Sequence, residues 1–162
     1  MKRNQNCTSY QSGFTLIEVM VVIAIIGIIS LVAVVNMIGW RTERQMQGAA
    51  RGFLADMQRA KITAIREGEA VSVLMNPGAG GSYQVFLDTN EDYTLDAGET
   101  QITSVTIPAA ITMQNVTFPS NRVQFNARGM AEISGQFKCE FSRSTGAILT
   151  VWANSVGNVW VQ

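Results

Sequence analysis

The chain has 162 residues, with twelve basic and twelve acidic side chains, and therefore no formal net charge. This length suffices for one domain plus an additional element. The sequence contains no histidine, which excludes Ser-His-Asp and Cys-His catalysis and removes the commonest general base. From Glu69 to the end it has eight acidic and four basic residues, a mildly acidic balance that is not typical of a nucleic-acid surface.

The first segment, residues 1–13, is polar and carries Lys2 and Arg3. A run of 22 residues without a charge extends from Val19 to Trp40. As a helix this run would span about 33 Å, which is enough to cross the hydrocarbon core of a bilayer. The positive charges before it place the N-terminus in the cytoplasm. The simplest interpretation is a single-pass signal anchor with the domain outside.

Glu18, which lies at the start of the apolar stretch, does not fit a simple anchor. An unpaired carboxylate in a membrane helix costs about 2.5–3.5 kcal/mol. A plain anchor has no use for such a group, whereas a carboxylate with a specific partner does. The position of Glu18 therefore indicates a pairing function.

The residues Gly13-Phe14-Thr15-Leu16-Ile17-Glu18, with the apolar run that continues to Ile29, resemble the signature of type IV pilins. The resemblance implies that a prepilin peptidase cuts between Gly13 and Phe14, removes residues 1–13 as a leader, and leaves Phe14 to be N-methylated. It also implies that Glu18 neutralises the amine of Phe14 on a neighbouring subunit. Residues 14–40 would then serve as a transmembrane helix and afterwards as the polymerisation helix.

Between residues 41 and 67, apolar side chains recur every three or four positions, which predicts an amphipathic helix. Its apolar face consists of Met46, Ala50, Phe53, Met57, Ala60 and Ala64, with Leu54 and Ile65 at the margin. Gly68 is well placed to terminate the helix. We expect the segments 14–40 and 41–67 to form one long helix, and the apolar face to pack on a sheet.

After Gly68 the apolar pattern changes to a period of two, which predicts strands. Residues 76–81 (Asn-Pro-Gly-Ala-Gly-Gly) are a strong turn signal. The predicted strands are Ala70–Met75, Tyr83–Asp88, Thr100–Ile107, Ile111–Phe118, Arg122–Asn126, Met130–Ser134, Phe137–Ser142, Ala147–Ala153 and Asn158–Val161. We therefore predict an α+β fold, in which a long N-terminal helix packs on an antiparallel β-sheet domain over residues 70–162, and residues 41–162 form the globular domain.

Three looser stretches are similar to the GspH/FimT-type minor pilins and pseudopilins, namely residues 58–73, Val123–Gly129 and Ala153–Val159. This resemblance implies the pilin fold and a non-enzymatic subunit of a type II secretion pseudopilus or a type IV pilus. The implied partners are the prepilin peptidase, other pilin or pseudopilin subunits, an inner-membrane assembly platform and membrane lipid. The implied location is the bacterial inner membrane, with the globular domain in the periplasm, and later a periplasmic or extracellular filament.

An alternative is a DNA-binding minor pilin of a competence pilus. It would need basic residues grouped on one face, and the β-rich part offers only Arg122, Arg128, Lys138 and Arg143. The two cysteines are Cys7, in the predicted leader, and Cys139. Removal of the leader leaves Cys139 without an intramolecular disulfide partner, and we expect a buried thiol. By resemblance, the lack of a C-terminal disulfide loop fits a minor subunit.

Residues 88–99 suggest a cation-binding loop. Oxygen-bearing side chains occupy loop positions 1, 3, 5, 9 and 12, and position 7 can offer a carbonyl, which is the spacing of a calcium loop. The predicted ligands are Asp88, Asn90, Asp92, Thr94, Asp96 and Glu99. Tyr93 stands where such a loop has glycine, and a positive φ is costly for an aromatic residue. The competing interpretation is a solvated acidic turn, and no other cofactor is expected.

Overall fold

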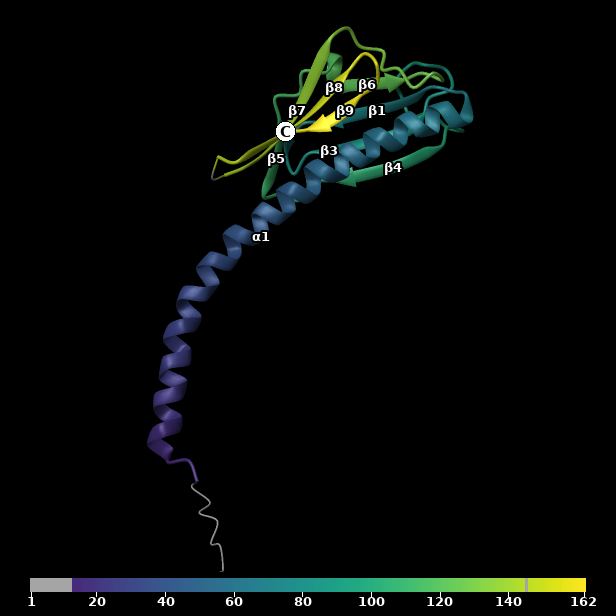
Figure 1. Cartoon of the computed structure of the whole chain (residues 1–162). Coiled ribbons are helices and arrows are strands. Elements are labelled where there is room, and N and C mark those ends of the chain that lie inside the picture. Colours follow the sequence, from purple (N-terminus) through teal and green to yellow (C-terminus); the bar gives the residue numbers. More distant parts are fainter. Residues whose placement is uncertain (1–12, 145) are drawn as a thin grey trace, which may run out of the picture. The chain divides into compact units, whose positions relative to one another are not determined.

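The computed structural model describes residues 13–144 and 146–162, with the backbone alone for residues 32–38. Most of the predicted leader, including Lys2, Arg3 and Cys7, lies outside the described residues. The chain divides into two compact units, Met1–Gly39 and Trp40–Gln162, each described by itself. The helix α1 (Leu16–Glu67) contains residues of both units without a break (Figure 1). The prediction of one long helix is therefore confirmed.

Both ends of α1 carry residues that are typical of helix termini. The hydroxyl of Thr15 accepts a hydrogen bond from the backbone N–H of Glu18 at 3.3 Å, which makes Thr15 the N-terminal cap. At the other end Gly68 has a φ of 73°, and its N–H donates to the carbonyl of Ala64 at 3.0 Å. This left-handed conformation favours glycine and ends the helix as the sequence predicts.

The second unit contains two antiparallel sheets. In the described residues the first sheet has the order β4-β3-β1-β6 and the second has the order β2-β5-β7-β8-β9. The strands are β1 (Val71–Asn76), β2 (Gly78–Ala79), β3 (Ser82–Leu87), β4 (Gln101–Thr106), β5 (Ile111–Gln114), β6 (Arg122–Phe125), β7 (Gln136–Arg143), β8 (Ile148–Asn154) and β9 (Val159–Val161). A 3-10 turn, η1 (Pro119–Asn121), precedes β6. With α1, they make the predicted α+β fold.

One strand prediction is wrong, and one short strand was not predicted. The predicted strand Met130–Ser134 is a single bridge between Phe125 and Ala131, after which the N–H of Ile133 turns back to the carbonyl of Ala131 at 2.9 Å. The predicted turn at residues 76–81 contains the short strand β2, which pairs with β5 in the other sheet. The chain therefore passes from the first sheet to the second and back within this turn.

The core of the second unit joins the helix to both sheets. The six central residues of the predicted apolar face of α1 are each 1% exposed or less, whereas Ile65 at its margin is 50% exposed. Phe53 of α1 is central, because its ring contacts Tyr83 of β3 at a centroid distance of 5.0 Å and Phe141 of β7 at 5.6 Å. These edge-on and tilted contacts are favourable for aromatic pairs. One helical side chain thus contacts a strand of each sheet.

Within the residues whose side chains are described, no helix has an apolar window long enough to cross a membrane.

Candidate functional site

The predicted cleavage point lies in an open segment before α1. Gly13 is exposed, and a Cβ added to it would meet no atom within 4 Å. Phe14, the next residue, is 84% exposed. A shallow hollow of about 230 Å³ on the helix is lined by Phe14, Glu18, Val19 and Val22. The backbone around the predicted scissile bond is therefore accessible, and Phe14 and Glu18 share one face of the chain.

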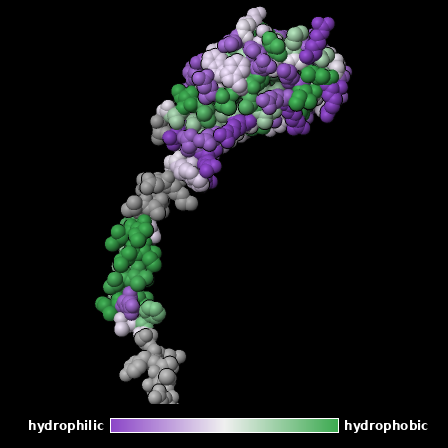
Figure 2. All heavy atoms as spheres, in the orientation of Figure 1, coloured by the Kyte–Doolittle hydropathy of each residue, from purple (hydrophilic) through white to green (hydrophobic). Residues whose placement is uncertain are grey.

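The described side chains of residues 14–31 are all exposed within their unit. They form the continuous hydrophobic surface visible in Figure 2. The hydroxyl of Ser30 donates to the carbonyl of Ile26 at 2.7 Å, so this polar group is satisfied inside the helix. Glu18 is the charged side chain of this surface. An apolar surface of this extent marks a site of contact with a partner or a lipid.

Glu18 also has a local role, because it is the third residue after the Thr15 cap. A carboxylate in the first turn of a helix gains about 0.3–1 kcal/mol from the helix dipole. That gain is smaller than the cost of about 2.5–3.5 kcal/mol for an unpaired carboxylate in a membrane helix. The local role therefore does not offset the cost of this position once the helix is surrounded by apolar groups.

The loop at residues 88–99 is organised around a buried carboxylate. Asp88 is 0% exposed. One oxygen of Asp88 accepts hydrogen bonds from the Ser72 hydroxyl at 2.6 Å, the Gln124 amide at 3.0 Å and the Tyr93 N–H at 3.0 Å. The other oxygen accepts from the N–H of Asp92 at 3.2 Å. Asp88 therefore connects the loop to β1 and β6, a structural role that the spacing in the sequence did not predict.

The other predicted ligands lie at the surface of the loop. The Asn90 amide donates to Asp92 at 3.0 Å and to Asp96 at 3.1 Å, so these three side chains converge. Glu99 accepts the N–H groups of Thr89 and Asp96, and thereby closes the loop. Across residues 13–144 and 146–162, no three acidic, His or Cys side chains are grouped tightly enough to hold a metal ion. The calcium site, including Thr94, stays a prediction.

Tyr93 adopts the left-handed conformation that the calcium-loop pattern requires at this position, with a φ of 66°. The guanidinium of Arg122 lies 4.2 Å from the centre of its ring, a favourable cation–π contact. Partial burial, followed by the negative charge of Glu132, raises the pKa of the Tyr93 hydroxyl. The strain at Tyr93 is therefore offset by contacts on both its backbone and its ring.

Three of the four basic residues of the β-rich part are engaged by neighbours. Arg122 covers Tyr93, Lys138 pairs with Glu140 at 2.5 Å, and Arg143 pairs with Glu43 of α1 at 3.2 Å. Hydrogen bonds from Lys138 and Asn115 hold the pKa of Glu140 below its usual range. These contacts engage three of the four positive charges of the β-rich part within the domain.

Cys139 of β7 is fully buried and is the free cysteine among the described residues. Burial, together with the nearby charge of Glu140, raises the pKa of its thiol to about 12. Because the thiolate is the reactive form, this thiol is unreactive at neutral pH in the folded chain. The expectation of a buried thiol is confirmed.

One surface feature of α1, which we call the basic stripe, was not predicted from the sequence. It consists of Arg41, Arg44, Arg51, Arg59 and Arg66, all exposed. At 100° per residue these positions fall within an arc of about 80°, on the side opposite the buried face. The signal was the recurrence of arginine at intervals close to seven residues, a spacing that returns to one face of a helix.

Two family models match the chain. Residues 49–157 match the family described as Type II transport protein GspH, and residues 8–34 match the prokaryotic N-terminal methylation motif. The chain is also similar to the Type II secretion system protein H of Aeromonas hydrophila, with 35% identity over 63 residues. This alignment covers 39% of the chain and 34% of that relative, so the chain spans about a third of its length.

Two solved structures have the same fold. The type IV minor pilin FimU of Pseudomonas aeruginosa has a TM-score of 0.59 at 15% identity, covering 74% of this chain and 90% of that one. The minor pseudopilin EpsH of the Vibrio cholerae Type 2 Secretion System has a TM-score of 0.55 at 12% identity, covering 73% and 96%. At these identities the likeness concerns the fold alone.

Proposed function

Since the chain belongs to the Type II transport protein GspH family, we infer that it is a minor pseudopilin, a non-enzymatic structural subunit of a secretion pseudopilus. The observation that best supports this function is the exposed apolar surface of residues 14–31, which contains the single carboxylate of Glu18. Such a surface needs lipid or other helices around it, and the carboxylate needs a cation. A filament with its apolar helices packed together meets both needs.

The matched methylation motif implies a prepilin-like chain that is processed at its N-terminus and held at the inner membrane. The finer proposal is that a prepilin peptidase cuts between Gly13 and Phe14 and that Phe14 is then N-methylated. The open backbone at Gly13 supports this choice of bond. Residues 14–40 would rest in membrane lipid until an inner-membrane assembly platform moves the subunit into the filament, with residues 41–162 in the periplasm.

In the filament, Glu18 would pair with the amine of Phe14 on a neighbouring subunit. Paired charges offset each other's desolvation, whereas removal of one partner leaves a buried charge at a cost of about 3–5 kcal/mol. The exposed placement of Phe14 and Glu18 on one hollow of the helix supports such a pairing, because both groups are open to a second chain.

Substitution of Glu18 tests this function. In full-length chains expressed with the secretion machinery, Glu18→Gln keeps the size of the side chain and removes its charge. We expect the leader to be cleaved normally, as measured by the mass of the mature chain. We expect incorporation into sheared filaments to fall at least about tenfold, because an unpaired amine remains.

The matched control is Thr15→Val, which removes the hydroxyl that caps the helix and leaves the charge of Glu18 in place. We expect Thr15→Val to be cleaved and incorporated near the wild-type level. Normal incorporation of Glu18→Gln would refute the pairing, and equal losses in the two variants would assign the effect to the helix cap instead.

A further inference from the structure

The strand β4 is an open margin of the first sheet. It pairs with β3 on one side, and among the described residues it has no strand on the other side. At the end of this ladder the N–H of Ile107 donates to the carbonyl of Gly81 at 2.8 Å. Because the backbone groups of an antiparallel strand alternate between its two sides, the N–H and C=O groups of Ser104 and Thr106 face the open side of β4.

This margin lacks the features that usually protect an edge strand. Natural proteins shorten or cover such strands, or place charges or proline in them. The strand β4 is six residues long and contains neither a charge nor a proline. By contrast, β2 and β9 have two and three residues, and the segment after β6 covers its outer side, because the N–H of Glu132 donates to the carbonyl of Gln124 at 2.8 Å. Among the described strands, β4 is therefore the margin best suited to accept another strand.

A bulge at the start of β4 directs one side chain into a hollow beside the helix. The register between β3 and β4 shifts between Val85 and Phe86, which leaves Ile102 as the extra residue. Bulges re-aim side chains in this way. Ile102 lines a hollow of about 690 Å³ together with Leu87 and with Ile62 of α1, which is 63% exposed. The hollow thus has an apolar floor that is open to a second chain.

A second hollow of about 300 Å³ lies at the other end of β4, next to Val105 and Thr106. Both hollows lie between α1 and β4, which run side by side (Figure 1), and we call them together the β4 groove. The helix residues that line the groove recur every three or four positions and so share one side of α1. Several of them are small, namely Gly48, Ala49, Gly52 and Ala55. Small side chains leave room for a neighbouring chain beside the helix.

The larger hollow carries an excess positive charge. Its charged lining residues are Arg59, Arg66 and Glu67. Arg66 pairs with Glu67 at 2.7 Å. For Arg59 the described residues contain no ion-pair partner. A chain that fills this hollow is therefore favoured if it brings a carboxylate to Arg59.

We propose that the β4 groove binds an extended segment of a different filament subunit, which adds to β4 as an antiparallel fifth strand of the first sheet. This inference rests on the proposed filament function. Strand addition of this kind takes its affinity from main-chain hydrogen bonds and its specificity from alternate side chains. Here the backbone of Ser104 and Thr106 pairs with the added strand. An apolar side chain of that strand fills the hollow at Ile102, and an acidic side chain reaches Arg59.

The charges of the groove favour a different subunit over a second copy of this chain. The simplest contact between two copies would pair β4 with β4 about a two-fold axis. Because β4 contains no charged residue, such a pair would bring no carboxylate from the strand to Arg59. An acidic strand from another protein satisfies both the open backbone and the arginine. A contact with a different protein also suits a subunit that is present in few copies.

Site-specific photo-cross-linking of full-length chains, expressed with the secretion machinery, tests the docking. The photoreactive residue p-benzoylphenylalanine replaces Gln101, which is exposed and lines the larger hollow. We expect an adduct with a different filament subunit, which mass spectrometry maps to an extended segment that contains Asp or Glu. The matched control places the same residue at Ser155, an exposed position between β8 and β9, and we expect little of this adduct from it.

A second variant tests whether the backbone of β4 takes part. Ser104→Pro removes an N–H that faces the open side, a place where an edge strand tolerates proline. Ser104→Ala removes the hydroxyl and keeps that N–H. In the chain with the photoreactive residue at position 101, we expect Ser104→Pro to lower the adduct yield about three- to tenfold, the effect of losing one backbone hydrogen bond. Ser104→Ala should leave the yield unchanged, and equal yields from the two variants would overturn strand addition.

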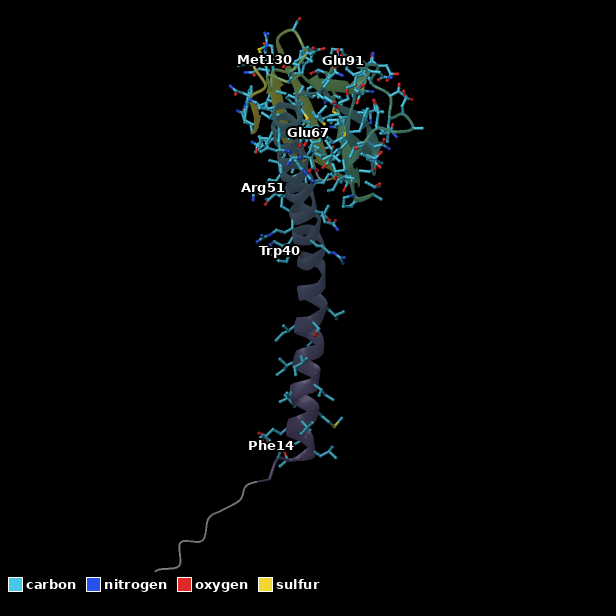
Figure 3. The ribbon with its side chains drawn as sticks, turned by 90° about the vertical axis from the view of Figure 1, so that its right-hand side faces the viewer. Phe14, Trp40, Arg51, Glu67, Glu91 and Met130 are labelled. Atoms are coloured by element: carbon cyan, nitrogen blue, oxygen red, sulfur yellow. The ribbon has the colours of Figure 1, made fainter. Side chains whose placement is uncertain are left out.

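Charge reversal gives a third measurement, which stays decisive even if Ser104→Pro lowers the melting temperature. Arg59→Glu should reduce the adduct about two- to fivefold, since it places like charges together. Arg51→Glu is the control, because Arg51 belongs to the same basic stripe but lines neither hollow. Figure 3 shows Arg51 projecting outward from α1. Equal yields from Arg59→Glu and Arg51→Glu would overturn the acidic partner.

The outcomes separate this docking from the proposed function. If the wild-type chain is absent from sheared filaments, the proposed function fails and the docking fails with it. If the chain is present but position 101 gives no more adduct than position 155, only the docking is overturned. An adduct that contains solely a second copy of this chain would overturn the choice of a different subunit.

Discussion

Glu140 of β7 illustrates how single contacts set the charge state of a group and with it the pH response of the fold. The amino group of Lys138 and the amide of Asn115 both donate to its carboxylate, the amide at 2.6 Å, and they lower its pKa. A group with a lowered pKa stabilises the folded state above its unfolded pKa, and this contribution is lost as the pH falls through the folded pKa.

We therefore predict that Glu140→Gln lowers the stability of the chain by about 1–2 kcal/mol at pH 6–7. The difference from wild type should shrink as the pH falls below the usual range of a glutamate, because the wild-type carboxyl is then protonated as well. Thermal melting of the two chains at pH 7 and pH 3 measures this. Glu132→Gln, at an exposed position, is the control, and an equal deficit at both pH values would contradict the charge-based account.

At the scale of elements, the loop at residues 88–99 is the place where a bound cation would stabilise the fold. If the loop binds calcium, millimolar Ca²⁺ should raise the melting temperature of the wild-type chain, because a ligand that binds only the folded state stabilises it. Asp92→Asn should abolish the shift, while Asp88 remains in its buried network. No shift and no heat of binding in titration calorimetry of wild type would eliminate the calcium interpretation.

The turn between β8 and β9 approaches another turn so closely that it requires glycine. A Cβ on Gly157 would lie 2.1 Å from the carbonyl oxygen of Gly129, which cannot be accommodated without moving backbone. The same turn is tied to α1, because the amino group of Lys61 donates to the carbonyl of Gly157 at 2.9 Å. These contacts join the second sheet to the helix near its C-terminal end.

We predict that Gly157→Ala destabilises the domain by about 3 kcal/mol or more, measured by denaturant unfolding. Gly68→Ala is the control, since Gly68 has nearly the same φ, 73° against 75°, but open space around its Cβ position. It should cost only the conformational term of about 1–2 kcal/mol. Equal losses in the two variants would show that the close approach does not matter.

The elements of this fold differ in how far the sequence could predict them. The helix α1 carries a cap at Thr15, a stop at Gly68 and an uninterrupted apolar period, and each of these is a local signal. The strand β2 has no local signal, because its pairing with β5 depends on residues more than thirty positions away. Residues 130–134 alternate like a strand, but the sharp turn at Ile133 ends the pairing after one bridge.

The candidate sites also divide into those with a local signal in the sequence and those that depend on distant residues. Glu18 could be found from the sequence, because one carboxylate in an apolar run is a local anomaly. The role of Asp88 could not, since its partners Ser72 and Gln124 come together only when β1, β3 and β6 pair. The arginine spacing was visible, but placing it on the exposed side depended on knowing which face of α1 is buried.

At the scale of the whole molecule, the two units should respond to substitution in different ways. Phe53 is buried between the two sheets, whereas Ile25 is 51% exposed on the apolar helix. We predict that Phe53→Ala lowers the free energy of unfolding by about 3–5 kcal/mol. We predict that Ile25→Ala leaves the melting of the domain unchanged and reduces incorporation into filaments. Thermal melting and filament shearing measure the two effects, and a large loss of stability in Ile25→Ala would contradict this separation.

The buried thiol of Cys139 makes the opening rate of the folded domain measurable. With a pKa of about 12 and no exposed surface, the sulfur reacts with an alkylating reagent only during moments when the strands around it separate. At high reagent concentration the rate of modification therefore equals the rate at which β7 and β8 open. Alkylation kinetics would thus report how often a single subunit opens, without an engineered cysteine and without dissolving the assembly that contains it.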